Sequence, residues 1–127
     1  MSTKVLLDTC ILIDFLNGVP GAAKEINSHP DRAISIITWI EVMVGTNPLT
    51  ETDTRSYLDK IPVLLLDNTV AEKAVNLTIS RRQAGKKNLK VPDASILATA
   101  QVSERILVTR NTKDFPADDP GIQVPKY

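Results

Sequence analysis

Short runs of apolar residues recur along the chain, and longer stretches with the spacing of amphipathic helices separate them. A short apolar run bounded by turn residues is typical of a buried strand, whereas apolar residues three or four positions apart indicate a helix. We expect strands at residues 4–7, 33–36, 63–65, 106–108 and 122–124. We expect helices at about residues 9–16, 22–27, 38–45, 51–60, 70–83 and 92–100. Strands that alternate with helices predict an α/β fold, in which helices cover both faces of a parallel sheet.

Three of the predicted helices carry a local signal at their start. Pro92 precedes Asp93 and a run of small and apolar residues. Because the fixed φ of proline suits a first helical turn, we expect Asp93 at a helix N-terminus. Thr9 offers a hydroxyl to cap the helix that follows the first strand. Thr38 and Glu41 have the Thr-x-x-Glu spacing of a capping box, which predicts that the third helix opens there.

Length and composition limit the class of protein. A chain of 127 residues suggests one domain, 1–127, which buries roughly two thirds of the surface that its unfolded chain exposes. The 15 basic and 15 acidic residues balance, so binding to nucleic acid requires a local patch. The single cysteine, Cys10, excludes an internal disulfide and a CxxC motif. Asp8 and Asp14 interrupt the apolar N-terminal stretch, and no apolar run reaches about 18 residues, so we expect a soluble, cytoplasmic protein.

Four acidic residues are placed where the predicted sheet brings them to one edge. Asp8 ends the first strand, and Glu41 comes one turn after the second. Asp93 opens the helix that leads to the fourth strand, and Asp114 follows that strand. A turn or a helix cap explains each acid taken alone. Together they favour a bound cation, because crowded carboxylates repel one another, and oxygen ligands of this kind suit Mg²⁺ or Mn²⁺.

Four segments that contain these acids match one known family in the order that the family has them. The segments are residues 5–9, 35–41, 92–100 and 108–115, with the sequences VLLDT, SIITWIE, PDASILATA and VTRNTKDF. The chain resembles the PIN-domain ribonucleases, and most closely the VapC toxins of bacterial and archaeal toxin–antitoxin pairs. The resemblance implies a PIN-like fold with about five parallel strands and an endoribonuclease that uses Mg²⁺, with Mn²⁺ as a substitute. It also implies an RNA substrate, a cognate antitoxin protein and a homodimer.

The resemblance assigns roles to individual residues. It implies that Asp8 and Asp93 are direct metal ligands. It implies that Glu41 and Asp114 complete a catalytic site of four acids. Divalent ions held in this way activate water and stabilise the charge that develops on a phosphate.

Other residues are implied as supports of that site, and here the sequence leaves one alternative open. Thr9 and Thr109 correspond to supporting hydroxyls. Asn111 falls at a loop position where relatives carry either Asn or Asp, so the fourth contact comes from Asn111 or from Asp114. Residues 94–95 are Ala and Ser where many relatives carry another acid, which leaves a fifth carboxylate in doubt.

A basic segment lies directly before Asp93 and is a candidate for binding the RNA backbone. The RNA-binding residues that we predict are Arg81, Arg82, Lys86, Lys87, Lys90 and, after the fourth strand, Arg110. Lys and Arg side chains beside a metal site are suited to hold phosphates. A solvated helix end, favoured by the helix dipole, explains the same segment equally well.

Other classes of protein fit part of this pattern. A receiver-type phosphoacceptor domain also has acids at the ends of five parallel strands, but its acid after the third strand has only Asp67 as a candidate. A phosphatase of the haloacid type requires Asp-x-Asp after the first strand, where residues 8–10 are Asp, Thr and Cys. A PIN-fold nuclease that processes RNA or DNA without an antitoxin has the same four acids. Small size favours the toxin, and the four acids argue against an inert binding module.

Overall fold

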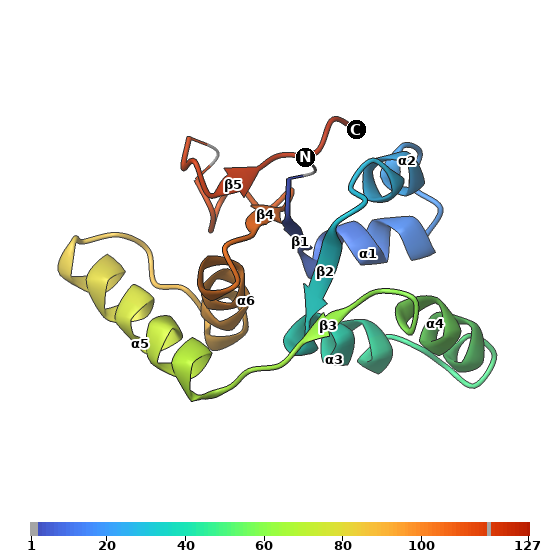
Figure 1. Ribbon diagram of the computed structural model, residues 1–127, viewed down its shortest axis with the longest axis horizontal. Coiled ribbons are helices and arrows are strands. Elements are labelled where there is room, and N and C mark those ends of the chain that lie inside the picture. Colours follow the sequence, from blue (N-terminus) through green and yellow to red (C-terminus); the bar gives the residue numbers. More distant parts are fainter. Residues whose placement is uncertain (1–2, 117) are drawn as a thin grey trace.

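A computed structural model of the chain describes residues 3–116 and 118–127 (Figure 1). In chain order, its elements are β1 (Val5–Leu7), α1 (Thr9–Leu16), α2 (Ala22–Asn27), β2 (Arg32–Ser35), α3 (Ile36–Val44), α4 (Glu51–Leu58), β3 (Val63–Leu64), α5 (Asn68–Gln83), α6 (Val91–Val102), β4 (Ile106–Val108) and β5 (Ile122–Gln123). Every strand and helix predicted from the sequence is present, and no bound differs by more than two residues. No helix in the described part of the chain is long and apolar enough to cross a membrane.

The five strands form one parallel sheet in the order β3-β2-β1-β4-β5. The first strand is therefore central: Val5 pairs with Arg32 of β2 on one side and with Ile106 of β4 on the other. The chain builds outward from β1 to β3 and then crosses to β4, so the strand order reverses between β1 and β4. Ligands of open α/β sheets bind beyond the carboxyl ends of the strands at such a reversal. Receiver domains have a different strand order, 2-1-3-4-5, so the topology excludes the receiver interpretation.

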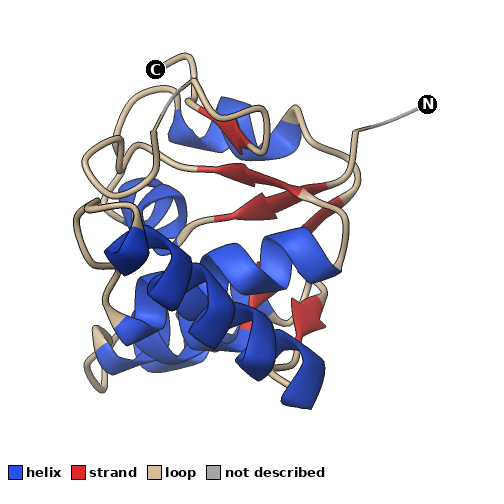
Figure 2. Ribbon diagram, turned by 90° about the vertical axis from the view of Figure 1, so that its left-hand side faces the viewer, coloured by secondary structure: helices blue, strands red, loops and turns tan. Residues whose placement is uncertain are grey.

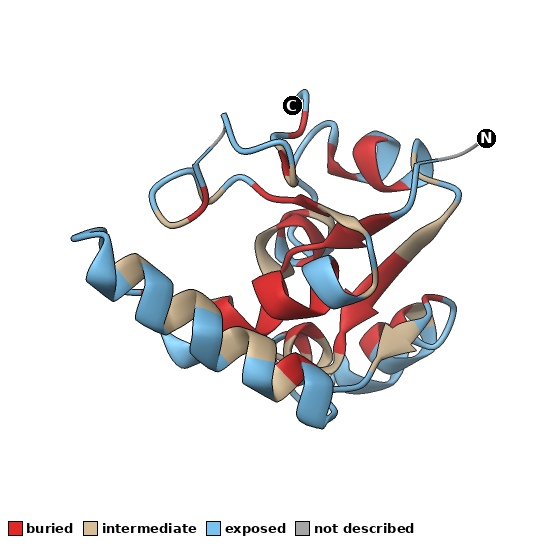
Figure 3. Cartoon of the chain, turned by 60° about the vertical axis from the view of Figure 1, so that its left-hand side comes forward, coloured by how far each residue is buried: buried red, intermediate tan, exposed pale blue. Residues whose placement is uncertain are grey.

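Alternation along each strand creates two hydrophobic cores, one on each face of the sheet. Val5 and Leu7 point to the first core, and Leu6 between them points to the second. The first core also contains Ile11, Leu12, Ile26, Ile34, Val42, Leu58, Ile61 and Val108. The second also contains Ala33, Leu89, Ala94, Ile96, Leu97, Ala100, Leu107, Phe115 and Ile122. Figure 3 shows this buried interior running through the strands and the facing sides of the helices.

The helices cover both faces of the sheet. Figure 1 shows α5 and α6 on one side of the strands and α1, α2 and α4 on the other. Figure 2 views the sheet from the α5–α6 side. The short helix α3 contributes to both cores, since Val42 packs in the first and Ile37 against the second. This layered arrangement confirms the predicted α/β fold.

Two of the predicted helix caps are wrong. Helix α3 begins at Ile36, because the Ser35 hydroxyl accepts a hydrogen bond from the backbone N–H of Ile37 (3.0 Å). The Thr38-x-x-Glu41 pattern therefore lies inside the helix and is not a capping box. Helix α1 is capped by the carboxylate of Asp8 rather than by Thr9, which is the first helical residue. In both cases the side chain that ends the preceding strand also caps the helix, which places α1 and α3 directly over the carboxyl edge of the sheet.

Candidate active site

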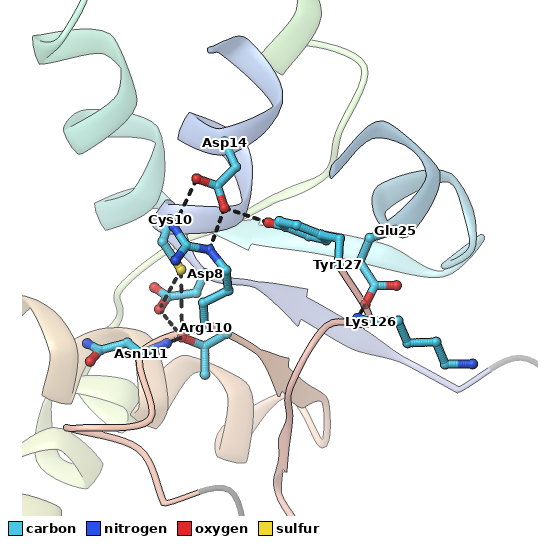
Figure 4. Close-up of polar contacts among 9 residues, drawn as sticks. Asp8, Cys10, Asp14, Glu25, Arg110, Asn111, Lys126 and Tyr127 are labelled. Atoms are coloured by element: carbon cyan, nitrogen blue, oxygen red, sulfur yellow. Dashed lines mark hydrogen bonds and ion pairs between the residues drawn. The ribbon is translucent and has the colours of Figure 1, made fainter. Parts of the chain in front are cut away.

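Asp8 lies at the centre of the site, at the point where β1 ends and α1 begins. Its Oδ1 accepts a hydrogen bond from the backbone N–H of Thr9 (2.8 Å), and its Oδ2 accepts one from the hydroxyl of Thr109 (2.6 Å). Figure 4 shows Asp8 beside Cys10. The residue is only 5% exposed. Burial raises the pKa of the Asp8 carboxyl, although these hydrogen bonds oppose the shift. Because burial disfavours the charged form of this carboxylate, a cation bound beside it would stabilise that form.

The turn that follows β4 supplies the partners of Asp8 and of Asp114. The buried Thr109 hydroxyl, besides donating to Asp8, accepts a hydrogen bond from the backbone N–H of Asn111 (2.9 Å). The backbone N–H of Thr109 donates to the carbonyl of Gln123 in β5 (3.0 Å). The side-chain amide of Asn111 donates to Oδ2 of Asp114 (3.0 Å). One turn thus orients two of the four predicted acids.

Asp93 lies in the first turn of α6, as the sequence predicts, and the other three acids lie near enough to affect it. Partial burial is the largest cause that raises the pKa of the Asp93 carboxyl. The negative charges of Asp8, Asp114 and Glu41 raise it further, in that order, and Lys90 opposes them. The four acids therefore share one electrostatic environment at the carboxyl edge of the sheet.

Glu41 reaches the site from α3 and is exposed to solvent. Its Oε1 accepts a hydrogen bond from the hydroxyl of Thr9 (2.7 Å). The same hydroxyl lies 3.0 Å from that of Thr38, which is fully buried. Thr9 therefore orients Glu41, and the Thr-x-x-Glu spacing serves the site rather than the start of the helix.

Asp114 is the acid that carries a cationic partner. Nζ of Lys87 lies 2.9 Å from its Oδ1. This bond and the one from Asn111 hold the pKa of the Asp114 carboxyl below its ordinary value. The carboxylate is therefore ionised at neutral pH, and the structure brings both Asn111 and Asp114 to the rim of the site.

The donor chemistry of these residues suits a hard divalent cation. In the residues that the structure describes, no three His, Cys, Asp or Glu side chains are close enough to hold an ion between them. Mg²⁺ requires less, since it is bound through one or two carboxylates and retains several waters. The repulsion that raises the pKa of Asp93 is the kind that a bound cation relieves. The residues therefore fit a Mg²⁺ or Mn²⁺ ion.

The predicted RNA-binding residues lie in different surroundings. Lys87 and Lys90 are exposed beside the acids, as their effects on Asp114 and Asp93 show. Arg82 and Lys86 are exposed at the end of α5 and in the following loop, where Nε of Arg81 donates to the carbonyl of Lys87 (3.2 Å). The sixth residue, Arg110, is half exposed, and its guanidinium is bound to the carboxylate of Asp14.

Comparison with known proteins identifies the family. The family model described as PIN domain matches residues 5–117. The chain belongs to the PIN-domain family. It is 27% identical over 124 residues to Ribonuclease VapC19 of Mycobacterium tuberculosis, with 94% of this chain and 98% of that protein covered.

Solved structures of related PIN domains agree with this fold. A chain of a toxin–antitoxin complex from Klebsiella pneumoniae is 43% identical, covers 94% of this chain and 96% of its own length, and superposes with a TM-score of 0.82. A chain of FitAcB from Neisseria gonorrhoeae, 24% identical, covers 95% of this chain and 96% of its own, with a TM-score of 0.78. The second similarity concerns the fold alone, because identity is below a quarter.

The structure of this PIN domain also reveals residues that the sequence did not indicate. Asp14, read from the sequence only as a charge that interrupts an apolar run, is buried and accepts hydrogen bonds from Arg110 and Tyr127. Cys10 is partly buried, with its Sγ 3.7 Å from Oδ2 of Asp8. Burial, and then the charge of Asp8, raise the pKa of the Cys10 thiol. No local pattern marks either residue, because Arg110, Tyr127 and Thr109 are remote in sequence and a separation of two between Cys10 and Asp8 is no helical spacing.

Proposed function

We propose that this PIN domain is a Mg²⁺-dependent endoribonuclease that acts as the toxin of a type II toxin–antitoxin system. The observation that carries the proposal is the gathering of Asp8, Glu41, Asp93 and Asp114 at the carboxyl edge of the sheet, with Asp8 held by Thr109 and Glu41 by Thr9. Burial, and then the charges of the other three acids, raise the pKa of Asp93 there. The ribonuclease VapC19 and the Klebsiella toxin–antitoxin complex support the same assignment. Mn²⁺ is expected to replace Mg²⁺, because both accept oxygen ligands.

Asp8 and Asp93 are the proposed metal ligands, and Glu41 and Asp114 complete the site. A divalent ion held there activates water and stabilises charge on a phosphodiester. The contribution of the chain is orientation. Thr109 fixes the Asp8 carboxylate by a 2.6 Å hydrogen bond, and the Thr9 hydroxyl fixes Glu41 by one of 2.7 Å. These two hydrogen bonds restrict the side chains of Asp8 and Glu41 before metal or substrate binds.

The RNA backbone is proposed to lie over the loop that joins α5 to α6. Lys86, Lys87 and Lys90 are exposed on this loop, and Arg81 and Arg82 lie on the last turn of α5. The ion pair between Lys87 and Asp114 involves a lysine side chain that is 64% exposed, so a phosphate is able to compete for the ammonium group. Arg110 is the weakest member of the predicted set, because its guanidinium is already bound to Asp14.

An antitoxin protein is the proposed partner, and a groove of about 720 Å³ beside α1, α3 and α4, lined by apolar and polar residues, is the proposed site for a segment of such a protein. Its lining includes Ile13, Leu16, Val42 and Tyr57. The groove follows the same helices, α1 and α3, that carry Thr9 and Glu41. We also propose that the protein is a homodimer, as the resemblance implies, and works in the cytoplasm.

We expect the antitoxin to place an Arg or Lys side chain among the acids, since a guanidinium pairs with carboxylates in a bidentate fork. The measurement is the affinity of the cognate partner for the wild type and for the triple variant Asp8→Asn, Glu41→Gln, Asp93→Asn. Affinity should fall by at least tenfold in the variant. Equal affinity would contradict insertion of a cation but would leave the nuclease assignment intact.

The nuclease itself is tested by incubating a mixed RNA pool with the protein in Mg²⁺, Mn²⁺ or EDTA. Cleavage is expected with either ion and not with EDTA, and Asp93→Asn should abolish it while the circular dichroism spectrum stays native. Cleavage that persists in EDTA would refute metal dependence. A processing nuclease without an antitoxin remains the alternative with the same four acids, and the presence of an adjoining small antitoxin gene decides between the two.

A further inference from the structure

A charged network links three segments that are far apart in sequence, close to the proposed active site (Figure 4). Asp14 of α1 accepts two hydrogen bonds from the guanidinium of Arg110, from Nε at 2.5 Å and from Nη2 at 2.9 Å. The hydroxyl of Tyr127, in the segment after β5, donates a third at 2.6 Å. Helix α1, the turn after β4 and the segment after β5 are thus tied together at one carboxylate.

The network has the features of a specific structure rather than of a chance surface pair. Asp14 is only 7% exposed, and a buried carboxylate needs partners of this kind. Burial alone would raise the pKa of Asp14, but the bonds from Arg110 and Tyr127 outweigh it and hold the pKa below its ordinary value. Tyr127 is also seated closely: Gly21 has a φ of +89°, and a Cβ at that position would lie 2.5 Å from the Cβ of Tyr127. Only glycine allows this approach.

Arg110 stands between the two residues of the turn that contact the acids. Thr109 precedes it and donates to Asp8, and Asn111 follows it and donates to Asp114. The backbone N–H of Asn111 closes the turn on the Thr109 hydroxyl (2.9 Å). Because neighbouring residues share one backbone, a guanidinium held by Asp14 limits the movement of the whole turn, and with it the orientation of both acids.

From this geometry we propose that Asp14 and Tyr127 are positioning residues, which act through Arg110 to hold the Thr109–Asn111 turn and thereby orient Asp8 and Asp114 for metal binding. The proposal rests on the proposed nuclease function for its link to metal and RNA. Its structural part, the restraint of the turn, holds for any function of the site. It also gives Arg110 a role different from contact with RNA.

Four variants test the proposal. Asp14→Asn keeps the shape of the side chain and removes the charge that binds Arg110, which is exposed enough to be hydrated when released. Arg110→Met keeps the aliphatic stem and removes the guanidinium. The double variant removes both charges and avoids a buried, unpaired Asp14. Tyr127→Phe removes one hydrogen bond alone and should have the smallest effect.

The chain offers a matched control at the other end of the strands. Nη1 of Arg105 lies 3.2 Å from Oδ1 of Asp31 and also donates to the backbone carbonyl of Val5 (3.1 Å). Asp31→Asn therefore removes the charged contact of an arginine that touches the sheet but not the acids, and leaves its bonds to the backbone carbonyls of Val5 and Asp31. Any general loss of stability should appear in this variant as well, whereas effects on the site should not.

The first readout is hydrogen exchange at the amide of Asn111, compared with amides of the central strand. We expect exchange at Asn111 to rise at least tenfold in Asp14→Asn and Arg110→Met, without change in β1, and to stay at the wild-type rate in Asp31→Asn. The second is calorimetric titration with Mn²⁺, for which supporting contacts of metal ligands typically contribute about 10- to 100-fold in affinity. We expect a loss of about tenfold in each charge variant, and no greater loss in the double variant, because the two residues act as a unit.

The third readout separates positioning from RNA binding. On a single-stranded RNA substrate, kcat should fall by about tenfold in Asp14→Asn while KM stays within twofold. If Arg110 instead binds phosphate, Arg110→Met will raise KM with unchanged Mn²⁺ affinity, and Asp14→Asn will not weaken the enzyme, which overturns the proposal. Unchanged exchange at Asn111 in both variants overturns it too. If the wild type neither binds Mn²⁺ nor cleaves RNA, the proposed function fails, and exchange alone decides whether the network restrains the turn.

Discussion

Replacing Asp8 by Asn removes the central charge of the site with little change of shape. Asn is as good a helix N-cap as Asp, so the bond to the backbone N–H of Thr9 and the start of α1 should persist. The hydroxyl of Thr109 now meets either an oxygen or an NH₂ group and is able to rotate to suit each. Folding is therefore expected, and the effect of the change is electrostatic.

Two opposing effects determine the stability of the metal-free variant. A hydrogen bond to a charged group contributes about 1.5–3 kcal/mol and a neutral one about 0.5–1.5 kcal/mol, so the bond from Thr109 weakens by about 1 kcal/mol. Against this, a neutral Asn avoids the cost of burying a charge, the cost that raises the pKa of Asp8. It also removes the repulsion between Asp8 and Asp93. About 1 kcal/mol corresponds to about 4 °C in a domain of this size. We expect the metal-free Tm to stay within about 4 °C of the wild type.

The loss of metal binding should exceed that change. An ion that binds only the folded state at a hundredfold excess over its Kd stabilises it by about 2.7 kcal/mol, or about 10 °C here. The assay is thermal unfolding in EDTA and in a Mn²⁺ series. The wild type should gain about 10 °C and Asp8→Asn little or nothing, with cleavage lost. A variant that retains the full Mn²⁺ shift removes Asp8 from the metal ligands, and one that fails to fold in EDTA refutes the charge argument.

Glu41→Gln should abolish cleavage and reduce the Mn²⁺ shift. Its metal-free Tm should be at or above that of the wild type, because Glu41 caps no helix and its charge repels the other acids. Normal cleavage with an unchanged Mn²⁺ shift would remove Glu41 from the site. Lys87→Gln, measured by RNA anisotropy in the inactive Asp93→Asn background, should lower the slope of log K against log salt by about 0.7, with Lys24→Gln as the control that leaves it unchanged; equal slopes would refute phosphate contact. The pKa of Asp14 is lowered, so its stabilisation is complete above the unfolded value of about 4 and is lost as pH falls through the folded one. The Tm difference between wild type and Asp14→Asn should thus narrow below about pH 4, and a constant difference from pH 7 to pH 2 would show that the charge is not its cause.

The fold was predictable because its signals are local and repeated. The apolar runs at Val5–Leu7 and Ile106–Val108 each lie within one strand, and turn residues bound them. Asp93 was placed correctly because Pro92 marks the first helical turn on the sequence itself. Strand order did not follow from these signals, since pairing of β1 with β4 depends on packing of the whole sheet.

The errors and omissions arise where tertiary contacts override local chemistry. Thr38 and Glu41 have the spacing of a cap, but the end of β2 allows Ser35 to cap the helix first, and both side chains turn to Thr9 instead. The pairing of Asp14 with Arg110 joins residues 96 positions apart, which no periodicity reveals. The resemblance indicated Thr9, Thr109 and Asn111 beside the four acids. Nothing in the sequence indicated the contacts of Asp14 with Arg110 and Tyr127.

The long separation between Asp8 and Thr109, 101 positions along the chain, has a consequence for biosynthesis. The central strand β1 is made first, yet one of its two neighbours, β4, is made almost last. At about 5–20 residues per second, a ribosome needs roughly 5–20 s to add the residues between them. During that interval Asp8 has neither its hydroxyl partner nor the turn that carries Asp114. The four acids therefore come together only late in synthesis, when β4 pairs with β1 through contacts between residues far apart in the sequence.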